Sequence, residues 1–362
     1  MKTNNVFMYA LLLAVSVFLI SCEDNKDNSS GIYSNGVFII NEGGMTASSA
    51  SVSFIDSKDS VSQDIFSKAN DKIVLGSVLQ SAYYYSNKIF LVVNNSNRIA
   101  VVNASTFKQE QQIEGLMQPR YMVDIYGRAY ITQWDVDGKG KVKVVDLATY
   151  KVTKTIEVGT GAEGIVLANG KLWVANSGGY GSDSTISVID PTTDAVVKTV
   201  KVADSPRKMV VDKDKNIWVL CSGAAIYDSN PPYALLKESS SMLVKINTSD
   251  YSVTKTIISA HVHPSQLDIS YDKSKLYFGC NGNDGIYEVS ASTPVVANKP
   301  LIAGYFYGFS VDPKTGEIYV CDAKDYATSG VVTKYSATGV KIKSYPAGIN
   351  PNSVLFPQVI NL

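Results

Sequence analysis

The chain has 362 residues, of which 45% are hydrophobic and 18% are charged. This composition supports a large hydrophobic core and excludes a disordered or collagen-like chain. The 33 basic and 33 acidic residues cancel, so no overall positive field attracts nucleic acid or an anionic membrane.

The N-terminal segment has the pattern of a targeting signal. Lys2 precedes an apolar run over residues 6–20, which is shorter than the ~20 residues that a helix needs to cross a bilayer. The run ends in Leu-Ile-Ser-Cys at Cys22, which resembles the lipobox of bacterial lipoproteins. That resemblance implies a signal peptide over residues 1–21 and acylation of the Cys22 thiol. An ordinary secretory signal is the alternative.

Residues 22–35 are polar and without periodicity, and we interpret them as the lipidated cysteine and a flexible tether. Glu23 and Asp24 directly after Cys22 resemble the surface-export signal of lipoproteins from Bacteroidota. That resemblance implies a protein anchored in the outer membrane through its lipid and facing the cell exterior. A solvated linker without a sorting role is the alternative.

Residues 36–362 carry an internal repeat. An apolar residue, an aromatic residue and further apolar residues recur together seven times, with these aromatic members: Phe38, Phe90, Tyr130, Trp173, Trp218, Tyr277 and Tyr319. A second series of strands also counts seven, and its strands end in a polar residue that can hold a turn: Asp56, Asn103, Asp146, Asp190, Asn247, Ser290 and Ser336. In most units a third strand alternates apolar and polar residues, and a loop with Gly or Pro then leads into a fourth.

Four strands in each unit of roughly 43 residues, repeated seven times, predict one all-β domain over residues 36–362. The predicted fold is a seven-bladed β-propeller of four-stranded antiparallel blades. The first unit lacks the strand that precedes its aromatic strand, and residues 350–356 at the other end copy the start of that missing strand. We therefore predict that the C-terminal segment closes the first blade.

The repeat also carries a family resemblance over residues 36–356. The segments WVAN, TISVID and AVVKTVKV within residues 173–202 resemble the YVTN-type propeller repeat of surface-layer and YncE-like proteins. The opening segment GVFIINEGG at residues 36–44 resembles the start of propeller lipoproteins from Bacteroidota, among them the BtuG-like proteins. BtuG-like proteins capture vitamin B12 at the cell surface and sit over an outer-membrane transporter. The resemblance thus implies cobalamin as a ligand rather than a cofactor, and a TonB-dependent transporter as a partner.

A propeller concentrates function on the face built by the loops between strands two and three and by the loops between blades. We predict that the interblade loops present a ring of side chains at the channel mouth: Gly76, Arg120, Glu163, Arg207, Ser265, Tyr307 and Asn352. Polar loops add five aromatic residues: Trp134, Tyr180, Tyr227, Tyr233 and Tyr326. Exposed aromatic rings cost free energy unless something covers them.

An aromatic rim with convergent polar groups suits a large, flat, amphipathic ligand or a partner protein. The predicted ligand-binding residues are Arg120, Trp134, Glu163, Tyr180, Arg207, Tyr227, Tyr233, Tyr307, Tyr326 and Asn352. Packing of each ring on a neighbouring loop is the alternative. The long insertion over residues 224–241 contains several apolar residues and is a candidate functional arm or lid.

The histidines and cysteines leave further alternatives open. His261 and His263 lie two residues apart in one interblade loop, where they could bind a transition metal or a cobalt centre, or simply be solvated. Cys221, Cys280 and Cys321 each end an apolar strand, which favours buried thiols over disulfides.

Catalytic motifs are missing from the sequence: it has no G-x-S-x-G elbow, P-loop, Rossmann glycine pattern or H-E-x-x-H motif. Some propellers of similar repeat type are lactonases that use a central divalent metal, and Glu42, Asn176 and Asp322 could converge in that way. We predict a binding protein without catalysis or cofactor. A protein- or glycan-interaction propeller and a metal-dependent lactonase are the alternatives.

Overall fold

The computed structural model of the protein describes residues 31–136, 138–280, 282 and 284–357. The predicted signal peptide over residues 1–21, the predicted lipidation site Cys22 and most of the predicted tether lie outside the described residues. The chain divides into two units, Met1–Ser30 and Gly31–Leu362, and the fold described below belongs to the second. Among the described residues, no helix is long and apolar enough to cross a membrane.

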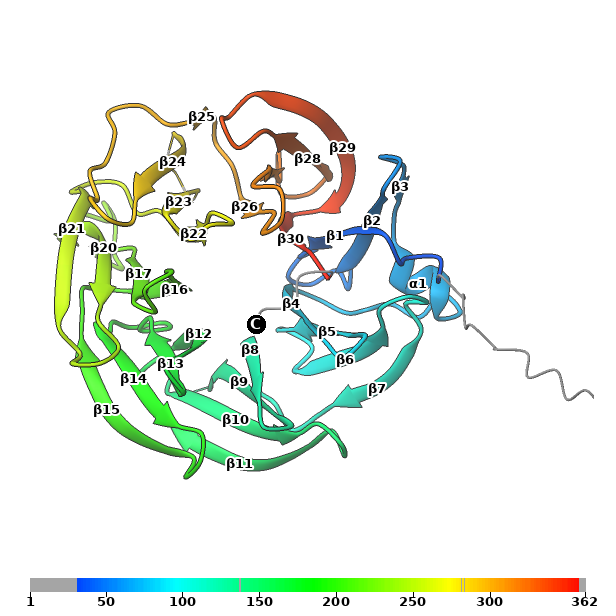
Figure 1. The fold of residues 1–362 in the computed structure, drawn as a ribbon, viewed down its shortest axis with the longest axis horizontal. Coiled ribbons are helices and arrows are strands. Elements are labelled where there is room, and N and C mark those ends of the chain that lie inside the picture. The colour runs from blue at the N-terminus through cyan, green and yellow to red at the C-terminus, as the bar shows by residue number, and fades with distance from the viewer. Residues whose placement is uncertain (1–30, 137, 281, 283, 358–362) are drawn as a thin grey trace, which may run out of the picture. The chain divides into compact units, whose positions relative to one another are not determined.

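Seven four-stranded antiparallel sheets stand around a central axis (Figure 1). Blade 1 comprises, from axis to rim, β30 (Pro351–Leu355), β1 (Gly36–Asn41), β2 (Ser51–Asp56) and β3 (Val61–Ser62). Blade 2 comprises β4 (Leu79–Tyr85), β5 (Lys88–Val93), β6 (Arg98–Asn103) and β7 (Gln109–Ile113). Blade 3 comprises β8 (Pro119–Ile125), β9 (Arg128–Trp134), β10 (Gly140–Asp146) and β11 (Lys151–Glu157).

The other four blades follow in the same order around the ring. Blade 4 comprises β12 (Ala162–Ala168), β13 (Lys171–Asn176), β14 (Thr185–Asp190) and β15 (Ala195–Lys201). Blade 5 comprises β16 (Pro206–Val211), β17 (Ile217–Cys221), β20 (Ser241–Ile246) and β21 (Val253–Ser259). Blade 6 comprises β22 (Gln266–Ile269), β23 (Lys275–Gly279), β24 (Gly285–Ser290) and β25 (Ile302–Ala303). Blade 7 comprises β26 (Gly308–Val311), β27 (Ile318–Asp322), β28 (Ser329–Tyr335) and β29 (Lys341–Ile349). The predicted all-β, seven-bladed fold is therefore confirmed.

The C-terminal strand closes the ring as predicted. β30 pairs antiparallel with β1, so that Phe38 lies opposite Leu355 and Ile39 opposite Val354. The Gly348 amide donates to the Asn41 side-chain oxygen at 2.9 Å, and the Asn350 side chain donates to the Gly43 carbonyl at 3.0 Å. The first blade thus consists of strands from both ends of the described chain.

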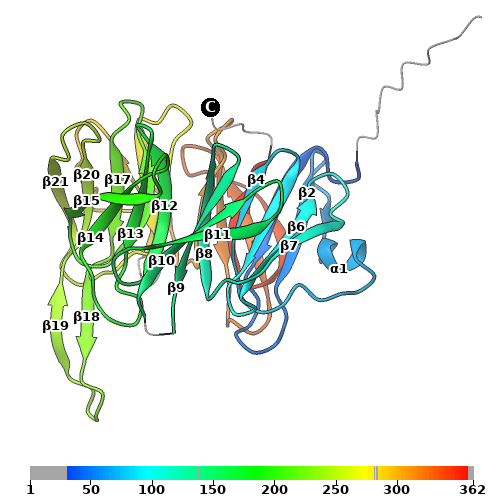
Figure 2. The same cartoon turned by 90° about the horizontal axis from the view of Figure 1, so that it is seen from below.

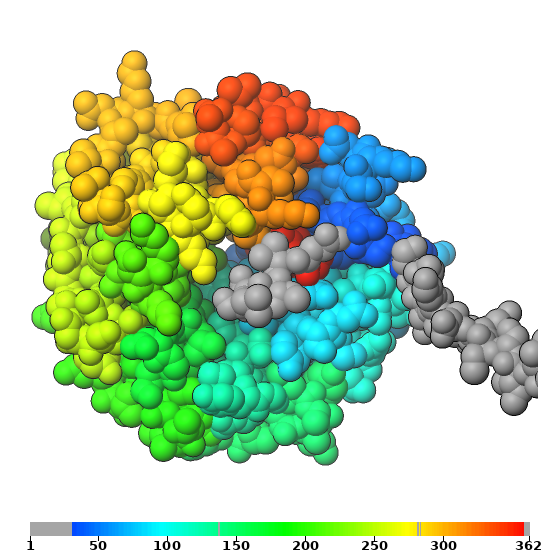
Figure 3. Space-filling model, in the orientation of Figure 1, coloured from blue at the N-terminus to red at the C-terminus, as the bar shows by residue number. Residues whose placement is uncertain are grey.

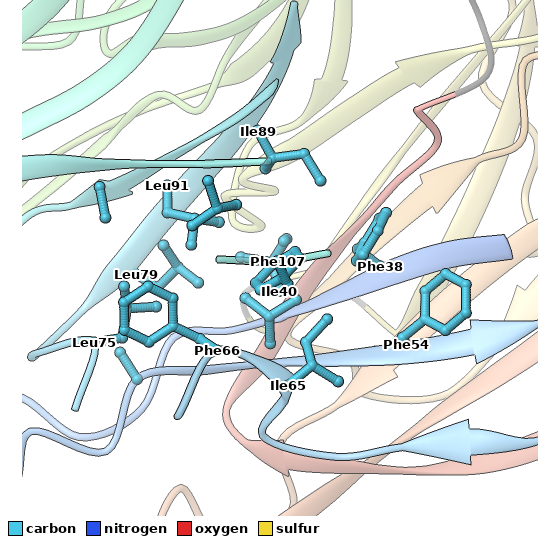
Figure 4. Close-up of a cluster of buried hydrophobic side chains, with 14 of the residues drawn as sticks. Phe38, Ile40, Phe54, Ile65, Phe66, Leu75, Leu79, Ile89, Leu91 and Phe107 are labelled. Carbon is cyan, nitrogen blue, oxygen red and sulfur yellow. The ribbon is translucent and has the colours of Figure 1, made fainter. Parts of the chain in front are cut away.

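The core lies between neighbouring blades. All seven aromatic residues of the repeat lie in the second strand from the axis and are buried. Because successive side chains of a strand point to opposite faces of its sheet, each such strand packs against both neighbouring blades. Along β1, Phe38 and Ile40 belong to the cluster between blades 1 and 2 (Figure 4). Ile39 instead packs with Tyr319 of blade 7.

Blade 1 departs from the repeat at the rim. β3 has only two residues, and the short helix α1 (Ile65–Ala69) follows it. Ile65 and Phe66 of α1 are buried in the cluster between blades 1 and 2 (Figure 4). The sequence analysis did not predict this helix, which supplies apolar surface that the short rim strand does not.

The three propeller cysteines are free and buried. Burial raises the pKa of the Cys221 thiol to about 12. The prediction of buried thiols is confirmed.

The two faces of the ring differ. One face, which we call the loop face, carries the loops between the second and third strands and the loops between blades. On this face the insertion of blade 5 folds into a hairpin of β18 (Ala224–Tyr227) and β19 (Leu235–Ser239), which projects from the ring (Figure 2). The described chain begins on the opposite face, where the Tyr33 amide donates to the Ser105 carbonyl at 3.1 Å (Figure 2). Figure 3 views that opposite face and shows an opening between the innermost strands.

Candidate ligand-binding site

A central pocket of about 960 Å³ opens on the loop face and is lined by residues from all seven blades. Its volume lies at the upper end of the range of roughly 300–1,000 Å³ that is typical of small-molecule sites. The pocket therefore has room for a large ligand.

Irregular starts of the innermost strands place side chains at this pocket. In five blades the pairing of the innermost strand with its neighbour shifts register within the first few residues. A β-bulge of this kind re-aims a side chain that would otherwise follow the alternation of the strand. The pocket-lining residues at these shifts are Gln80, Arg120, Glu163, Arg207 and Asn352.

Eight of the ten predicted ligand-binding residues line this pocket: Arg120, Trp134, Glu163, Tyr180, Arg207, Tyr307, Tyr326 and Asn352. Ser265 of the predicted ring lines it too. Gly76 does not, and Gln80 takes its place in blade 2. The sequence analysis chose Gly76 instead of Gln80 because blade 2 has Leu79 where four other blades have a proline directly before the pocket-facing residue.

Arg120 and Glu163 form a closed ion pair between blades 3 and 4. Arg120 Nε lies 2.9 Å from Glu163 Oε2 and Nη2 lies 2.7 Å from Oε1, and the two side chains are only 15% and 5% exposed. Burial lowers the pKa of Arg120, but the attraction and hydrogen bonds of Glu163 outweigh that effect and raise it. Arg120 therefore remains charged, and its guanidinium is fully engaged by the Glu163 side chain.

An aromatic pair stands beside this ion pair. The Arg120 guanidinium carbon lies 4.5 Å from the centroid of the Trp134 ring, and Tyr180 meets Trp134 edge-on with 5.4 Å between centroids. The Tyr180 hydroxyl donates to Gln118 Oε1 at 3.2 Å. The buried Trp134 indole N–H has no hydrogen-bond partner in the described part of the chain. The pair thus places flat apolar surface at the pocket.

A carboxylate from the β1–β2 loop occupies another side of the pocket. Glu42 Oε2 accepts hydrogen bonds from the Tyr307 hydroxyl at 2.8 Å and from the Asn352 side chain at 3.4 Å. Burial raises the pKa of Glu42, although the bonds from Tyr307 and Asn352 and the charge of Arg120 oppose the rise. The Tyr307 ring in turn meets Tyr326 edge-on, with 5.6 Å between centroids. This cluster holds Tyr307 and Tyr326 in place at the mouth.

Deeper residues of the axis were missed by the sequence analysis. Tyr121 accepts hydrogen bonds from Gln80 at 3.0 Å and from Lys208 at 2.8 Å. Below them a second cavity of about 270 Å³ reaches Asp268, whose Oδ2 accepts the Val311 amide at 2.8 Å. Burial raises the pKa of the Asp268 carboxyl to about 6. The signal available in the sequence was the alternation of side chains along each innermost strand.

Tyr227 and Tyr233 lie apart from the other predicted binding residues. Both are exposed on the projecting hairpin, and neither lines the central pocket. The sequence analysis placed both in the rim, but the rim of the pocket does not include them. The insertion pairs with itself as β18 and β19 and extends away from the ring instead of folding over it (Figure 2).

The histidines contact the base of this hairpin. Glu238 Oε2 lies 2.8 Å from His261 Nδ1, and Glu238 Oε1 lies 3.4 Å from His263 Nε2. His263 Nδ1 also lies 2.7 Å from the Ser222 carbonyl oxygen. The sequence analysis missed this contact because Glu238 belongs to the insertion, more than twenty residues before the histidines. These contacts fasten the hairpin to the following interblade loop.

The suggested metal ligands do not converge. Glu42 and Asp322 line the pocket, but Asn176 is buried outside it, where its side chain donates to Thr185 at 2.9 Å and to Ser187 at 3.0 Å. Within the described residues, no group of three His, Cys, Asp or Glu side chains is arranged to hold a metal ion. The proposed convergence of Glu42, Asn176 and Asp322 is therefore wrong.

Comparison with known proteins places the chain in a family and a fold. A family model described as "Domain of unknown function (DUF5074)" matches residues 35–360. A quinonprotein alcohol dehydrogenase-like protein from Bacteroides thetaiotaomicron is similar in structure, with a TM-score of 0.66, 18% identity and coverage of 90% of this chain and 79% of that one. The periplasmic gluconolactonase of Pseudomonas aeruginosa has a TM-score of 0.63, 13% identity and coverage of 88% and 97%. Hydrazine synthase of Kuenenia stuttgartiensis has a TM-score of 0.58, 18% identity and coverage of 74% and 85%.

The names of these structural neighbours describe unrelated activities on one fold. At such low sequence identity, the similarity to them establishes only the fold of this chain. They include a gluconolactonase, so propellers of this shape serve enzymes as well as other proteins. We found no curated protein similar in sequence to the chain.

Proposed function

The chain belongs to the DUF5074 family of domains of unknown function, and we propose that this member is a binding protein. Its pocket on the loop face takes a large, flat, amphipathic ligand without catalysing a reaction.

One observation carries this proposal. Four large apolar side chains that line the pocket are 61% to 76% exposed: Met45, Tyr180, Tyr305 and Tyr326. Isolated exposed apolar residues are ordinary, but a group of them around the mouth of a polar cavity marks a binding site. Aromatic faces above polar groups suit a ligand that is apolar on its broad surface and polar at its edges.

The carboxylates of the pocket support binding rather than chemistry. Glu163 is paired with Arg120, and Glu42 accepts bonds from Tyr307 and Asn352. Asp322 accepts the backbone amide of Lys324 at 2.8 Å. A general acid or base needs a carboxyl group within reach of the substrate, and these three are engaged with the protein.

Within this class of function we propose cobalamin as the first ligand to test. The support is the resemblance of residues 36–44 to the start of BtuG-like lipoproteins. The same resemblance supports a TonB-dependent transporter as partner, and the lipobox at Cys22 supports a lipid anchor in the outer membrane that faces the exterior. A propeller that binds a protein or a glycan is the alternative, and the exposed rim serves that equally.

Calorimetry with cyanocobalamin tests the proposal, and Tyr326→Ala is the diagnostic variant. Removing a ring that a ligand covers forfeits about 1.5–3 kcal/mol, which is roughly tenfold to a hundredfold in affinity. The matched control is Tyr126→Ala, because Tyr126 is equally exposed but lies in the β8–β9 turn, away from the pocket.

Three outcomes separate the alternatives. Binding that Tyr326→Ala weakens and Tyr126→Ala leaves unchanged supports the proposal. Binding that both variants leave unchanged places the ligand elsewhere and contradicts it. Hydrolysis of glucono-δ-lactone that disappears in Glu42→Gln favours an enzyme instead.

A further inference from the structure

The charged side chains around the pocket are not all neutralised by the protein. Seven of them line it: Glu42, Arg120, Glu163, Arg207, Lys208, Asp322 and Lys324. Arg120 is paired with Glu163, and the Lys208 ammonium donates to the Tyr121 hydroxyl and lies 4.0 Å from the centre of its ring.

Lys208 thus has a polar partner but no counter-charge, and the other two cations have neither within the described residues. Lys324 is exposed at the rim, where water solvates it. Arg207 is half-buried, and its guanidinium makes no ion pair or hydrogen bond with any residue that the structure describes. A half-buried guanidinium offers five donors and ordinarily finds an acceptor.

The backbone holds Arg207 at a fixed place. The pairing of β16 with β17 shifts register between Pro206 and Lys208, so Arg207 lies in a bulge. Its carbonyl oxygen packs against Gly164 of the neighbouring blade so closely that a Cβ on Gly164 would lie 2.4 Å from it. The position of this arginine is therefore set by the ring and not by a mobile loop.

The repeat itself shows what Arg207 is missing. Arg120 stands at the start of β8, and the equivalent residue of the next blade, Glu163, supplies its carboxylate. Arg207 stands at the same place in β16, but the equivalent residue of the next blade is Ser265, which is short and uncharged. The acceptor that the protein provides for Arg120 is thus not provided for Arg207.

We infer that Arg207 binds an oxyanion of the ligand, a carboxylate or a phosphate, with Ser265 and Gln266 as flanking donors. Ser265 and Gln266 line the pocket beside it, and the structure gives their side chains no hydrogen bond within the described residues. A guanidinium binds either oxyanion through parallel N–H donors. The inference rests on the proposed function and adds to it that the amphipathic ligand carries a negative group on the side of blades 5 and 6.

Three ring-matched probes test the inference on the full chain: 1-naphthol, 1-naphthoate and 1-naphthyl phosphate. We expect both anions to bind about tenfold or more tightly than the neutral naphthol, because a hydrogen bond to a charged group is stronger than one to a neutral group. The tighter of the two anions identifies the oxyanion that the site prefers.

Arg207→Gln should remove the advantage of the anions and leave naphthol binding unchanged. Lys324→Gln is the matched control, since it removes an exposed cation of the same rim and should keep the advantage. Ser265→Glu should also abolish it, because the new carboxylate would pair with Arg207 as Glu163 pairs with Arg120.

The outcomes distinguish this inference from the proposed function. Equal binding of the three probes to the natural protein overturns the oxyanion site and leaves the aromatic site standing. Anion binding that needs Arg207 but is unchanged in Tyr326→Ala overturns the aromatic site. Failure of all three probes to bind at millimolar concentration overturns both.

Discussion

The ion pair of Arg120 and Glu163 allows a sharp prediction about stability. Arg120→Met leaves the Glu163 carboxylate, whose side chain is 5% exposed, without its cation. Breaking a buried pair in this way costs roughly 3–5 kcal/mol, and because the Arg120 side chain is 15% exposed and water can enter, we expect about 3 kcal/mol.

The expected melting shift follows from the size of the domain. A propeller of about 330 residues has an unfolding entropy of about 0.7 kcal/mol/K, so a loss of about 3 kcal/mol lowers Tm by about 4 °C. Glu163→Gln should cost less than Arg120→Met, because the Arg120 guanidinium borders the pocket and can be hydrated.

The double variant tests whether Arg120 and Glu163 stabilise the protein as a coupled pair. Arg120→Met combined with Glu163→Gln leaves no unpaired charge, so it should be more stable than Arg120→Met alone. Calorimetric Tm values and urea midpoints for the four proteins give the coupling energy between the two sites. If the double variant loses the sum of the two single losses, the pair contributes no coupling, and the reasoning about a closed buried pair is refuted.

Three further predictions concern the scaffold. Removing the chain from Gly348 onward deletes β30 and should abolish cooperative unfolding, whereas removing only residues 358–362 should leave the transition intact. Unchanged melting of the protein that lacks β30 would refute ring closure. The pKa of Asp268 is raised to about 6, so its contribution to stability is fully present below its unfolded pKa of ~3.9 and is lost as pH rises through about 6. Asp268→Asn should therefore lose less Tm than the natural protein between pH 4.5 and pH 7.5. Cys221, Cys280 and Cys321 should resist a thiol reagent in the native protein at pH 8 and react in urea, and prompt native reaction of any of them would contradict their burial.

The sequence predicted the fold well because the repeat is a local signal. Each aromatic residue and each turn residue recurs within one unit, and a ring of similar units has one obvious arrangement. Helix α1 escaped prediction because it occurs in one blade only, after a rim strand of two residues, where Ile65 and Phe66 fill space between blades 1 and 2.

The candidate site was predicted in part. Positions such as Arg120, Glu163 and Arg207 follow from aligning the starts of the innermost strands. Their relations do not, because the partner of each side chain lies on the next blade, and only the ring brings residues about 43 positions apart into contact. The contrast between the paired Arg120 and the unpaired Arg207 is therefore visible only in three dimensions.

The position of the first described residues gives the molecule a direction. The chain joins the ring beside Ser105, on the side away from the pocket, and Tyr33 fixes it there by packing edge-on against Phe54 and Phe107. A support coupled at Gly31 therefore faces the side of the ring opposite the pocket and leaves the mouth open to solution. A biosensor surface prepared in that way should report the full affinity of the pocket, whereas coupling through the β18–β19 hairpin would turn the mouth toward the support.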